Sequence, residues 1–340
     1  MLFRNARWVA SDATFPRAHE ARETRAVRKM LSSTAKNIYW MGRYLQRAKS
    51  TARLIEATQR MALQSRGEEA AGVAAIFGME DEFRQRQQQS SGRLASLIDF
   101  LVIDENNPSS LVSSIGAARR NAREERNNIT VDVWESLNGL WLELSERLRG
   151  NRALLDRNAL IESVKKQAVM IFGAAQVTLL RDEAYNFLQL GAFLERADNT
   201  ARILDIKFHA LRPDGNPHAQ ELDYFAWSEV LACIGAVRTY RRIYRSALDP
   251  MKVAELMMLR RDVPRSVHHC LWMVDLSMCE LAEAYGSHGE ADRLAGELHA
   301  RLRYARIDQV FDMGLNKFLG GVRGDIATLS DEIGRQFLLD

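Results

Sequence analysis

The sequence predicts an all-α fold, a multi-helix bundle built from two related halves. Three observations support this. There are only six prolines in 340 residues, whereas proline makes up about 5% of an average chain and disrupts the interior of a helix. Apolar residues recur at three- and four-residue steps over long segments, and no segment shows the period-2 alternation of a strand. A 20-residue stretch also returns 149 residues later in recognisable form.

The bulk composition is that of an ordinary globular protein. Hydrophobic residues make up 46% of the chain and charged residues 27%, which excludes collagen-like, low-complexity and disulfide-framework classes. The three cysteines, Cys233, Cys270 and Cys279, have no CxxC spacing, so the chain is expected to bind no metal and to be cytoplasmic. No apolar run reaches the roughly 20 residues of a membrane span, and no cofactor-binding motif is present. We therefore expect neither a membrane association nor a cofactor.

The positive charge is concentrated at the N-terminus. Residues 1–29 hold seven basic and three acidic residues, whereas the rest of the chain holds 40 basic and 41 acidic residues. We interpret residues 1–29 either as a basic, disordered extension or as the product of a start assigned upstream of Met30. The nearly neutral remainder has no basic stripe interleaved with aromatic residues, so nucleic acid is not an expected partner.

The elements follow from periodicity and from capping residues. Ser32, Ser33 and Thr34 supply N-cap hydroxyl groups for an amphipathic helix over residues 35–64. Residues 65–92 are less regular and are expected to form a loop or a weak helix. Residues 212–220, with two prolines and a glycine, predict a loop. The remaining helices are predicted at residues 94–103, 110–127, 130–149, 154–180, 182–211, 222–247, 250–261, 264–285, 290–318 and 322–338.

The repeat relates residues 37–56 to residues 186–205. At a constant offset of 149, eight of 20 positions are identical, and they include Asn, Gly, Thr and two Arg residues. Chance similarity between two helices would match Leu and Ala rather than these residue types. We infer two halves, about residues 30–178 and 179–340, packed about a pseudo-twofold axis.

Polar residues flank both sides of the apolar stripe in the second copy. Asp198 precedes Arg202 by four residues, which predicts an ion pair along the helix. Glu195 lies too far from Arg202 for a direct pair, so its carboxylate is available to another partner. The corresponding positions of the first copy include Lys49 and Arg53. If the two helices face one another, these two cations are expected to complement Glu195 and Asp198.

Two interpretations of these residues remain open. One is a polar seam between packed helices, because buried charges persist mainly when they are paired. The other is a site in which arginines bind an anionic small molecule or peptide through its carboxylate or phosphate. Glu195 is the candidate catalytic residue, but it has no nucleophile or second acid at a diagnostic spacing, so no mechanism can be written. The residues of this seam or site are Asn37, Arg43, Arg47, Thr51, Arg53, Asn186, Glu195, Arg196, Asp198, Thr200 and Arg202.

Two smaller groups of residues include further candidate site residues. Arg123 and Arg126, together with Arg119 and the nearby Asn121, indicate either a solvated helix face or an anion-binding face. Arg265 follows Pro264, a residue suited to the first turn of a helix, so this segment predicts a helix start.

The opening of the first helix resembles the signature of the bacterial alpha-E domain family. Residues 30–54 carry the resemblance most clearly, and it extends over about residues 30–320. Its further segments are Asn107–Ser110, Asn121–Arg123, Trp134–Asn138, Leu194–Asp198, Tyr240–Tyr244 and Pro264–Val267.

The resemblance implies an all-α domain whose biochemical activity is not established. Genes of the family commonly neighbour circularly permuted ATP-grasp ligases and transglutaminase-like peptidases. This neighbourhood implies an accessory role in peptide synthesis or modification, with one of those proteins as partner. The alternative is an enzyme of the same pathway, centred on Glu195 and Arg202.

The chain departs from the family signature at three positions. Gln46 and Lys49 stand where glutamate is usual, and Arg120 also replaces a glutamate. If the first-half glutamate were catalytic in the family, this protein would be an inactive or specialised member.

Overall fold

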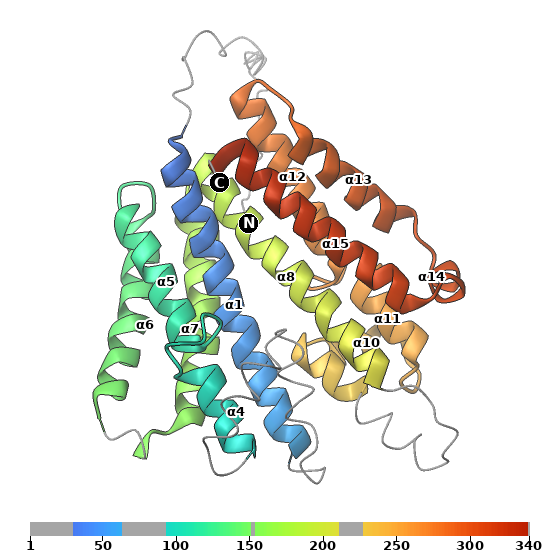
Figure 1. Cartoon of the computed structure of the whole chain (residues 1–340), viewed down its shortest axis with the longest axis horizontal. Coiled ribbons are helices and arrows are strands. Elements are labelled where there is room, and N and C mark those ends of the chain that lie inside the picture. The colour runs from blue at the N-terminus through green and yellow to red at the C-terminus, as the bar shows by residue number, and fades with distance from the viewer. Residues whose placement is uncertain (1–29, 63–92, 151–153, 211–226, 339–340) are drawn as a thin grey trace, which may run out of the picture.

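The computed structural model describes residues 30–62, 93–150, 154–210 and 227–338 (Figure 1). These residues form helices and connecting turns without any strand, which confirms the predicted all-α class. A further helical segment covers residues 227–233. The principal helices are α1 (Ser32–Ala62), α4 (Arg93–Val102), α5 (Leu111–Glu124), α6 (Val131–Arg149), α7 (Arg157–Thr178), α8 (Glu183–Ala210), α10 (Val237–Tyr244), α11 (Pro250–Met258), α12 (Val267–Tyr285), α13 (Glu290–Tyr304), α14 (Ile307–Met313) and α15 (Leu315–Ile333).

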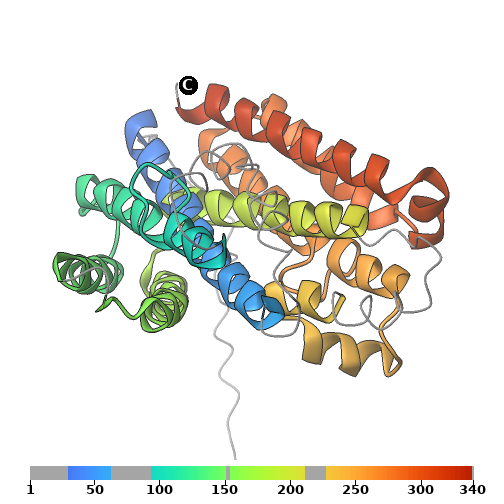
Figure 2. The same ribbon diagram turned by 60° about the horizontal axis from the view of Figure 1, so that its bottom comes forward.

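Helices α1 and α8 cross at the centre of the bundle and make its most extensive helix–helix contact. Helices α5 and α7 pack against α1, and α6 covers them from outside. Helices α12 and α15 pack against α8, and α13 lies against both. Figure 2 shows α4 to α7 on one side of the central pair and the later helices on the other.

A single contiguous hydrophobic core joins the two groups of helices. Its largest fully buried side chains include Tyr39 of α1, Phe187 of α8 and Tyr240 of α10. The buried hydroxyl of Tyr240 is satisfied because it donates to the Ala247 carbonyl and accepts from the Asp249 amide. The core therefore depends on both central helices at once.

The helix predicted at residues 222–247 is interrupted in the structure. Helical structure stops after residue 233 and resumes at Val237, with a turn at Gly235 between them. Gly235 has a φ of 68°, in the left-handed region where a side chain would be strained. Periodicity alone did not reveal this break, since the apolar pattern continues through it.

The predicted C-terminal helix boundaries were also partly wrong. The segment predicted at 290–318 ends at Tyr304, and a short α14 follows before Gly314, whose φ is 93°. Helix α15 then begins at Leu315 and continues into a π-helical turn, η2 (Gly334–Leu338). The predicted boundary between residues 318 and 322 lies inside α15, whose apolar face packs against the core.

Capping explains where α12 begins. The helix starts at Val267 rather than at residue 264, because Ser266 has an extended backbone and its hydroxyl accepts a hydrogen bond from the His269 amide. The expectations for residues 1–29, 65–92 and 212–220 lie outside the described residues.

Candidate functional site

Two glycines allow α1 and α8 to touch through their backbones. A Cβ atom at Gly42 would overlap the Leu188 carbonyl oxygen, and a Cβ atom at Gly191 would overlap that of Tyr39. Any larger residue would push the helices apart. The close approach places the side chains one turn further along, at positions 46, 47, 195 and 196, directly across from one another.

Glu195 is buried at this crossing between two arginines of α1. Arg47 donates to Oε1 through Nε at 2.8 Å and to Oε2 through Nη2 at 3.1 Å. Arg43 donates to Oε2 through Nε, also at 2.8 Å. Burial alone would raise the pKa of Glu195, but the two guanidinium groups outweigh it and lower that pKa to about 2. Glu195 is therefore a fixed anion at neutral pH.

The expected partners of the acidic residues were wrong. Glu195 binds Arg43 and Arg47 rather than Lys49 or Arg53, because those two residues lie on the other side of α1. Asp198 forms its ion pair along its own helix with Arg202, at 2.7 Å. The prediction of that i,i+4 pair is confirmed.

The arginine that α8 contributes to the crossing binds an amide instead of a carboxylate. Arg196 donates to Oε1 of Gln46 through Nη2 at 2.9 Å and through Nε at 3.3 Å. The 149-residue offset of the repeat relates Arg47 to Arg196 and Gln46 to Glu195. The Arg47–Glu195 and Arg196–Gln46 pairs therefore occupy equivalent positions. Gln46 stands where Glu195 stands in the other pair, so this half of the crossing lacks a negative charge.

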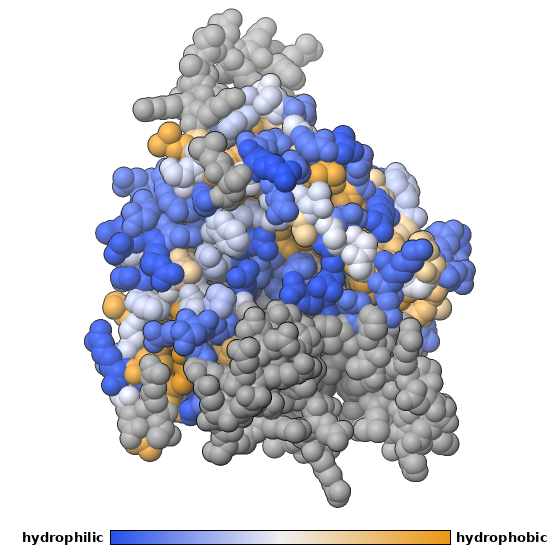
Figure 3. All heavy atoms as spheres, viewed as in Figure 1, coloured by the Kyte–Doolittle hydropathy of each residue, from blue (hydrophilic) through white to orange (hydrophobic). Residues whose placement is uncertain are grey.

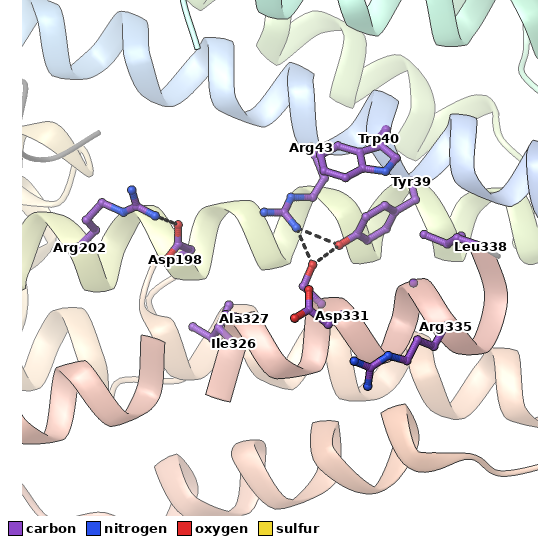
Figure 4. Close-up of a pocket in the computed structure, with 12 residues that line it drawn as sticks. Tyr39, Trp40, Arg43, Asp198, Arg202, Ile326, Ala327, Asp331, Arg335 and Leu338 are labelled. Atoms are coloured by element: carbon purple, nitrogen blue, oxygen red, sulfur yellow. Dashed lines mark hydrogen bonds and ion pairs between the residues drawn. The ribbon is translucent and has the colours of Figure 1, made fainter. Parts of the chain in front are cut away.

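Arg43 connects the buried Glu195 to an open cavity of about 560 Å³ (Figure 4). Its Nη1 donates to the hydroxyl groups of Tyr39 and Ser330, both at 2.9 Å, and these hydroxyl groups are 3.0 Å apart. The cavity lies between α1, α8 and α15. Its charged lining residues are Arg43, Asp198, Arg202, Asp331 and Arg335.

The comparisons with known proteins agree with these features. A family model described as a predicted alpha-helical domain with a conserved ER motif matches residues 30–338. The chain belongs to the Alpha-E family. The Glu195–Arg196 pair is an ER dipeptide of this chain, and it lies at the crossing of α1 and α8.

Three mycobacterial proteins are similar to this chain at low identity. They are the uncharacterised proteins Mb2597 of Mycobacterium bovis and MT2643 and Rv2567 of Mycobacterium tuberculosis. Each is 22% identical over 314 residues, which cover 86% of this chain but 34% of the relative. The chain thus spans about a third of the length of these relatives. No solved structure matches it.

Three of the other residues predicted for the seam or site form hydrogen bonds of their own, and a fourth does not. Asn37 donates to Glu125 at 2.7 Å, and Asn186 donates to the Asp182 carbonyl of its own helix. Thr200 donates to the carbonyl of Arg265 at 3.0 Å. The hydroxyl of Thr51 is buried without a hydrogen-bond partner.

The arginines near the end of α5 do not form one helix face as predicted. Helix α5 ends at Glu124, so Arg126 lies beyond it. Arg123 is exposed and pairs with its neighbour Glu124. Arg119 and Arg126 both lie over the ring of Trp134, at 5.8 and 4.8 Å. Asn121 is half-buried on α5.

A second cavity of about 630 Å³ lies between α1, α5 and α6. Arg120, one of the departures from the family signature, lines it together with Arg149, Glu105, Tyr44 and Trp141. Sequence reasoning did not identify Ser330, Asp331 or Arg335 at the first cavity, since no local pattern shows which face of a C-terminal helix meets α1. No group of three or more potential metal ligands occurs among the described residues.

Proposed function

We propose that this protein is a non-catalytic, cytoplasmic partner of an ATP-grasp-type amide-bond-forming system that synthesises or modifies peptides. The observation that carries the non-catalytic role is the state of Glu195, since both of its oxygens accept hydrogen bonds from Arg43 and Arg47. A carboxylate with a pKa of about 2 neither gives nor takes a proton near pH 7. The three cysteines, none of which forms a disulfide, suit a reducing compartment.

The length of the relatives supports the role of partner. In the mycobacterial proteins, the matching region makes up about a third of a longer chain. A domain that forms part of a longer chain in those proteins is expected to act together with other protein segments or domains. The resemblance to a family whose genes neighbour ATP-grasp ligases and transglutaminase-like peptidases points to those proteins. The helices of the described segments include none that is long and apolar enough to cross a bilayer.

The face of the molecule in Figure 3 offers polar recognition rather than one broad apolar interface. On the face seen in Figure 3, hydrophilic side chains cover most of the described surface and the apolar patches are separate. We therefore expect an association that depends on salt concentration, as is usual for interfaces steered by charge.

Co-purification tests this proposal. The full chain is co-expressed with a circularly permuted ATP-grasp ligase from the same organism, and the complex and the ATP-dependent rate of amide-bond formation are measured. A stable complex, or a rate that depends on the added protein, is the expected result. A ligase that neither binds the protein nor changes its rate would refute the partnership.

The second candidate function is an enzyme in the same pathway. The cavity of about 560 Å³ favours this candidate, because Arg202, Asp331 and Arg43, which also binds Glu195, line the cavity. Asp331→Asn tests this version without disturbing the buried pair. Asp325→Asn is the matched control, because Asp325 lies on the same helix and pairs with Arg301 outside the cavity. Loss of pathway activity with the first variant alone would favour an enzyme; equal activity of both variants would favour the non-catalytic partner.

A further inference from the structure

Four cationic side chains gather on the side of α1 opposite Glu195. We call this group the cation cluster: Lys49 and Arg53 of α1, Arg196 of α8, and Arg265 of the turn before α12. Lys49 is only 8% exposed, and its ammonium group lies 5.2 Å from the centre of the Phe172 ring. The cluster is therefore formed by three separate segments that fold together.

Within the described residues, the four cations of the cation cluster exceed the negative charge that lies beside them. Arg196 donates to the amide of Gln46 and to the Pro264 carbonyl, and Arg265 donates to the Ile234 carbonyl. These acceptors are neutral. Nε of Arg53 is buried and has no hydrogen-bond partner. Glu56 lies near Arg53, but its carboxylate also binds Lys165 at 3.0 Å.

Gly235 brings two of the guanidinium groups to one point on the surface. A Cβ atom added to this exposed glycine would lie 2.6 Å from Nη1 of Arg265 and 2.7 Å from Nη1 of Arg53. The two groups therefore border the same small space. The left-handed backbone of Gly235 keeps that space free of a side chain and open to solvent.

The free cluster is electrostatically unfavourable. Burial and the neighbouring Arg196, Arg265 and Arg53 lower the pKa of Lys49 to about 7. Burial and the nearby Arg53 and Arg196 likewise lower the pKa of Arg265 to about 10. The adjacent Cys270 does not compensate, because burial raises the pKa of its thiol to about 12 and keeps it neutral.

The equivalent positions of α8 include a negative charge that the α1 positions lack. Lys49 and Arg53 correspond to Asp198 and Arg202 in the 149-residue offset, and the α8 residues neutralise one another in an ion pair at 2.7 Å. The α1 residues repel one another instead. A purely structural seam between helices does not require an excess of positive charge, because buried charges persist in a fold when they are paired. A site that binds an anion does require it.

We propose that the cation cluster is a binding site for a phosphate dianion, either free or as the terminal phosphate of a nucleotide. Three guanidinium groups and an ammonium group match the charge and the several oxygens of phosphate better than they match a monovalent carboxylate. This site does not depend on the proposed partnership, and its test uses the full chain alone.

Thermal unfolding with and without phosphate, at constant ionic strength, tests the site. We expect the Tm of the wild-type protein to rise by roughly 3–6 °C at phosphate a hundredfold above its Kd. Arg53→Gln is expected to raise the Tm in phosphate-free buffer, because it removes repulsion, and to abolish the specific rise. Arg123→Gln is the matched control, since Arg123 is exposed and pairs only with Glu124. The control also corrects for the general stabilising effect of phosphate.

Each result decides between binding and a purely structural role. A phosphate-dependent rise that is as large in Arg53→Gln as in the wild type would overturn the proposal, and so would the absence of a rise in the wild type. Lys49→Met provides the same comparison if Arg53→Gln does not fold. Calorimetric titration with inorganic phosphate and with ADP then distinguishes the two sources, because the tighter ligand identifies whether the nucleotide is recognised. Titration with sulfate, which stays a dianion between pH 7 and 9, should be accompanied by proton uptake in the wild type and not in Lys49→Met.

Discussion

Arg47 holds both oxygens of Glu195 across the crossing of two helices that are far apart in the sequence. This bidentate pair fixes the direction of the carboxylate as well as its charge. Arg43 donates a further hydrogen bond to Oε2 of Glu195 and extends the network to Tyr39 and Ser330. The Glu195–Arg196 dipeptide is thus part of the packing between α1 and α8.

Glu195→Gln is expected to destabilise the protein by about 3–5 kcal/mol, because it leaves two largely buried arginines without their anion. Urea unfolding at pH 7 measures the change. Asp198→Asn is the comparison, since its ion pair with Arg202 lies on one helix and is more exposed; it should cost less than about 1 kcal/mol. Equal effects of the two substitutions would contradict the central role of Glu195.

Gly191→Ala is expected to cost about 3 kcal/mol or more, because the new methyl group would overlap the Tyr39 carbonyl and force α1 and α8 apart. Gly139→Ala provides a control of the same chemistry. Gly139 is exposed inside α6 with no atom within 4 Å of the added methyl group, so this change should stabilise the protein by about 0.5–1 kcal/mol. Chemical unfolding of both variants would show opposite signs; a stable Gly191→Ala would disprove the close crossing.

The stability of the protein is expected to rise between pH 7 and pH 9. The pKa of Lys49 is lowered from its ordinary value of 10.5 to about 7 in the folded state, so the unfolded chain binds more protons in this range. Raising the pH removes a charge that the folded state tolerates poorly. The urea midpoint of the wild type should increase over this interval, and that of Lys49→Met should change less. Identical slopes for the two proteins would rule out Lys49 as the cause.

Thiol labelling should distinguish one cysteine from the other two. Cys279 is exposed, whereas Cys233 and Cys270 are buried. A chromogenic disulfide reagent is expected to modify Cys279 in the native protein, slowly near pH 7, because burial and nearby acidic residues raise its pKa. All three thiols should react after denaturation. Rapid modification of more than one thiol in the native state would contradict the structure.

The fold class and most helices followed from the sequence because apolar periodicity records which face of each helix is buried. The breaks at Gly235 and Gly314 did not, since they depend on a left-handed backbone that the flanking pattern does not reveal. The sequence correctly predicted the ion pair between Asp198 and Arg202. It assigned the wrong cations to Glu195, because a helical wheel gives the direction of a side chain but not the crossing angle of its partner helix.

The residues of the cation cluster also could not be grouped from the sequence. The sequence predicts Lys49 and Arg53 as complements of Glu195 and Asp198, and it predicts Arg265 only as part of a helix start. Its position beside Arg53 depends on the turn at Gly235, which lies 30 residues away along the chain. No local pattern could bring these three residues together before the tertiary structure was available.

The crossing of α1 and α8 also constrains how the chain is made. Arg47 and Glu195 are separated by 148 residues, so α1 leaves the ribosome long before the helix that covers it. At about 5–20 residues per second, the delay is on the order of 7–30 s. Among the described helices made before α8, α4, α5 and α7 can cover α1 during that time. The face of α1 that packs against α8 therefore stays uncovered until α8 is made, and the core is completed only when the later helices that pack against α8 follow.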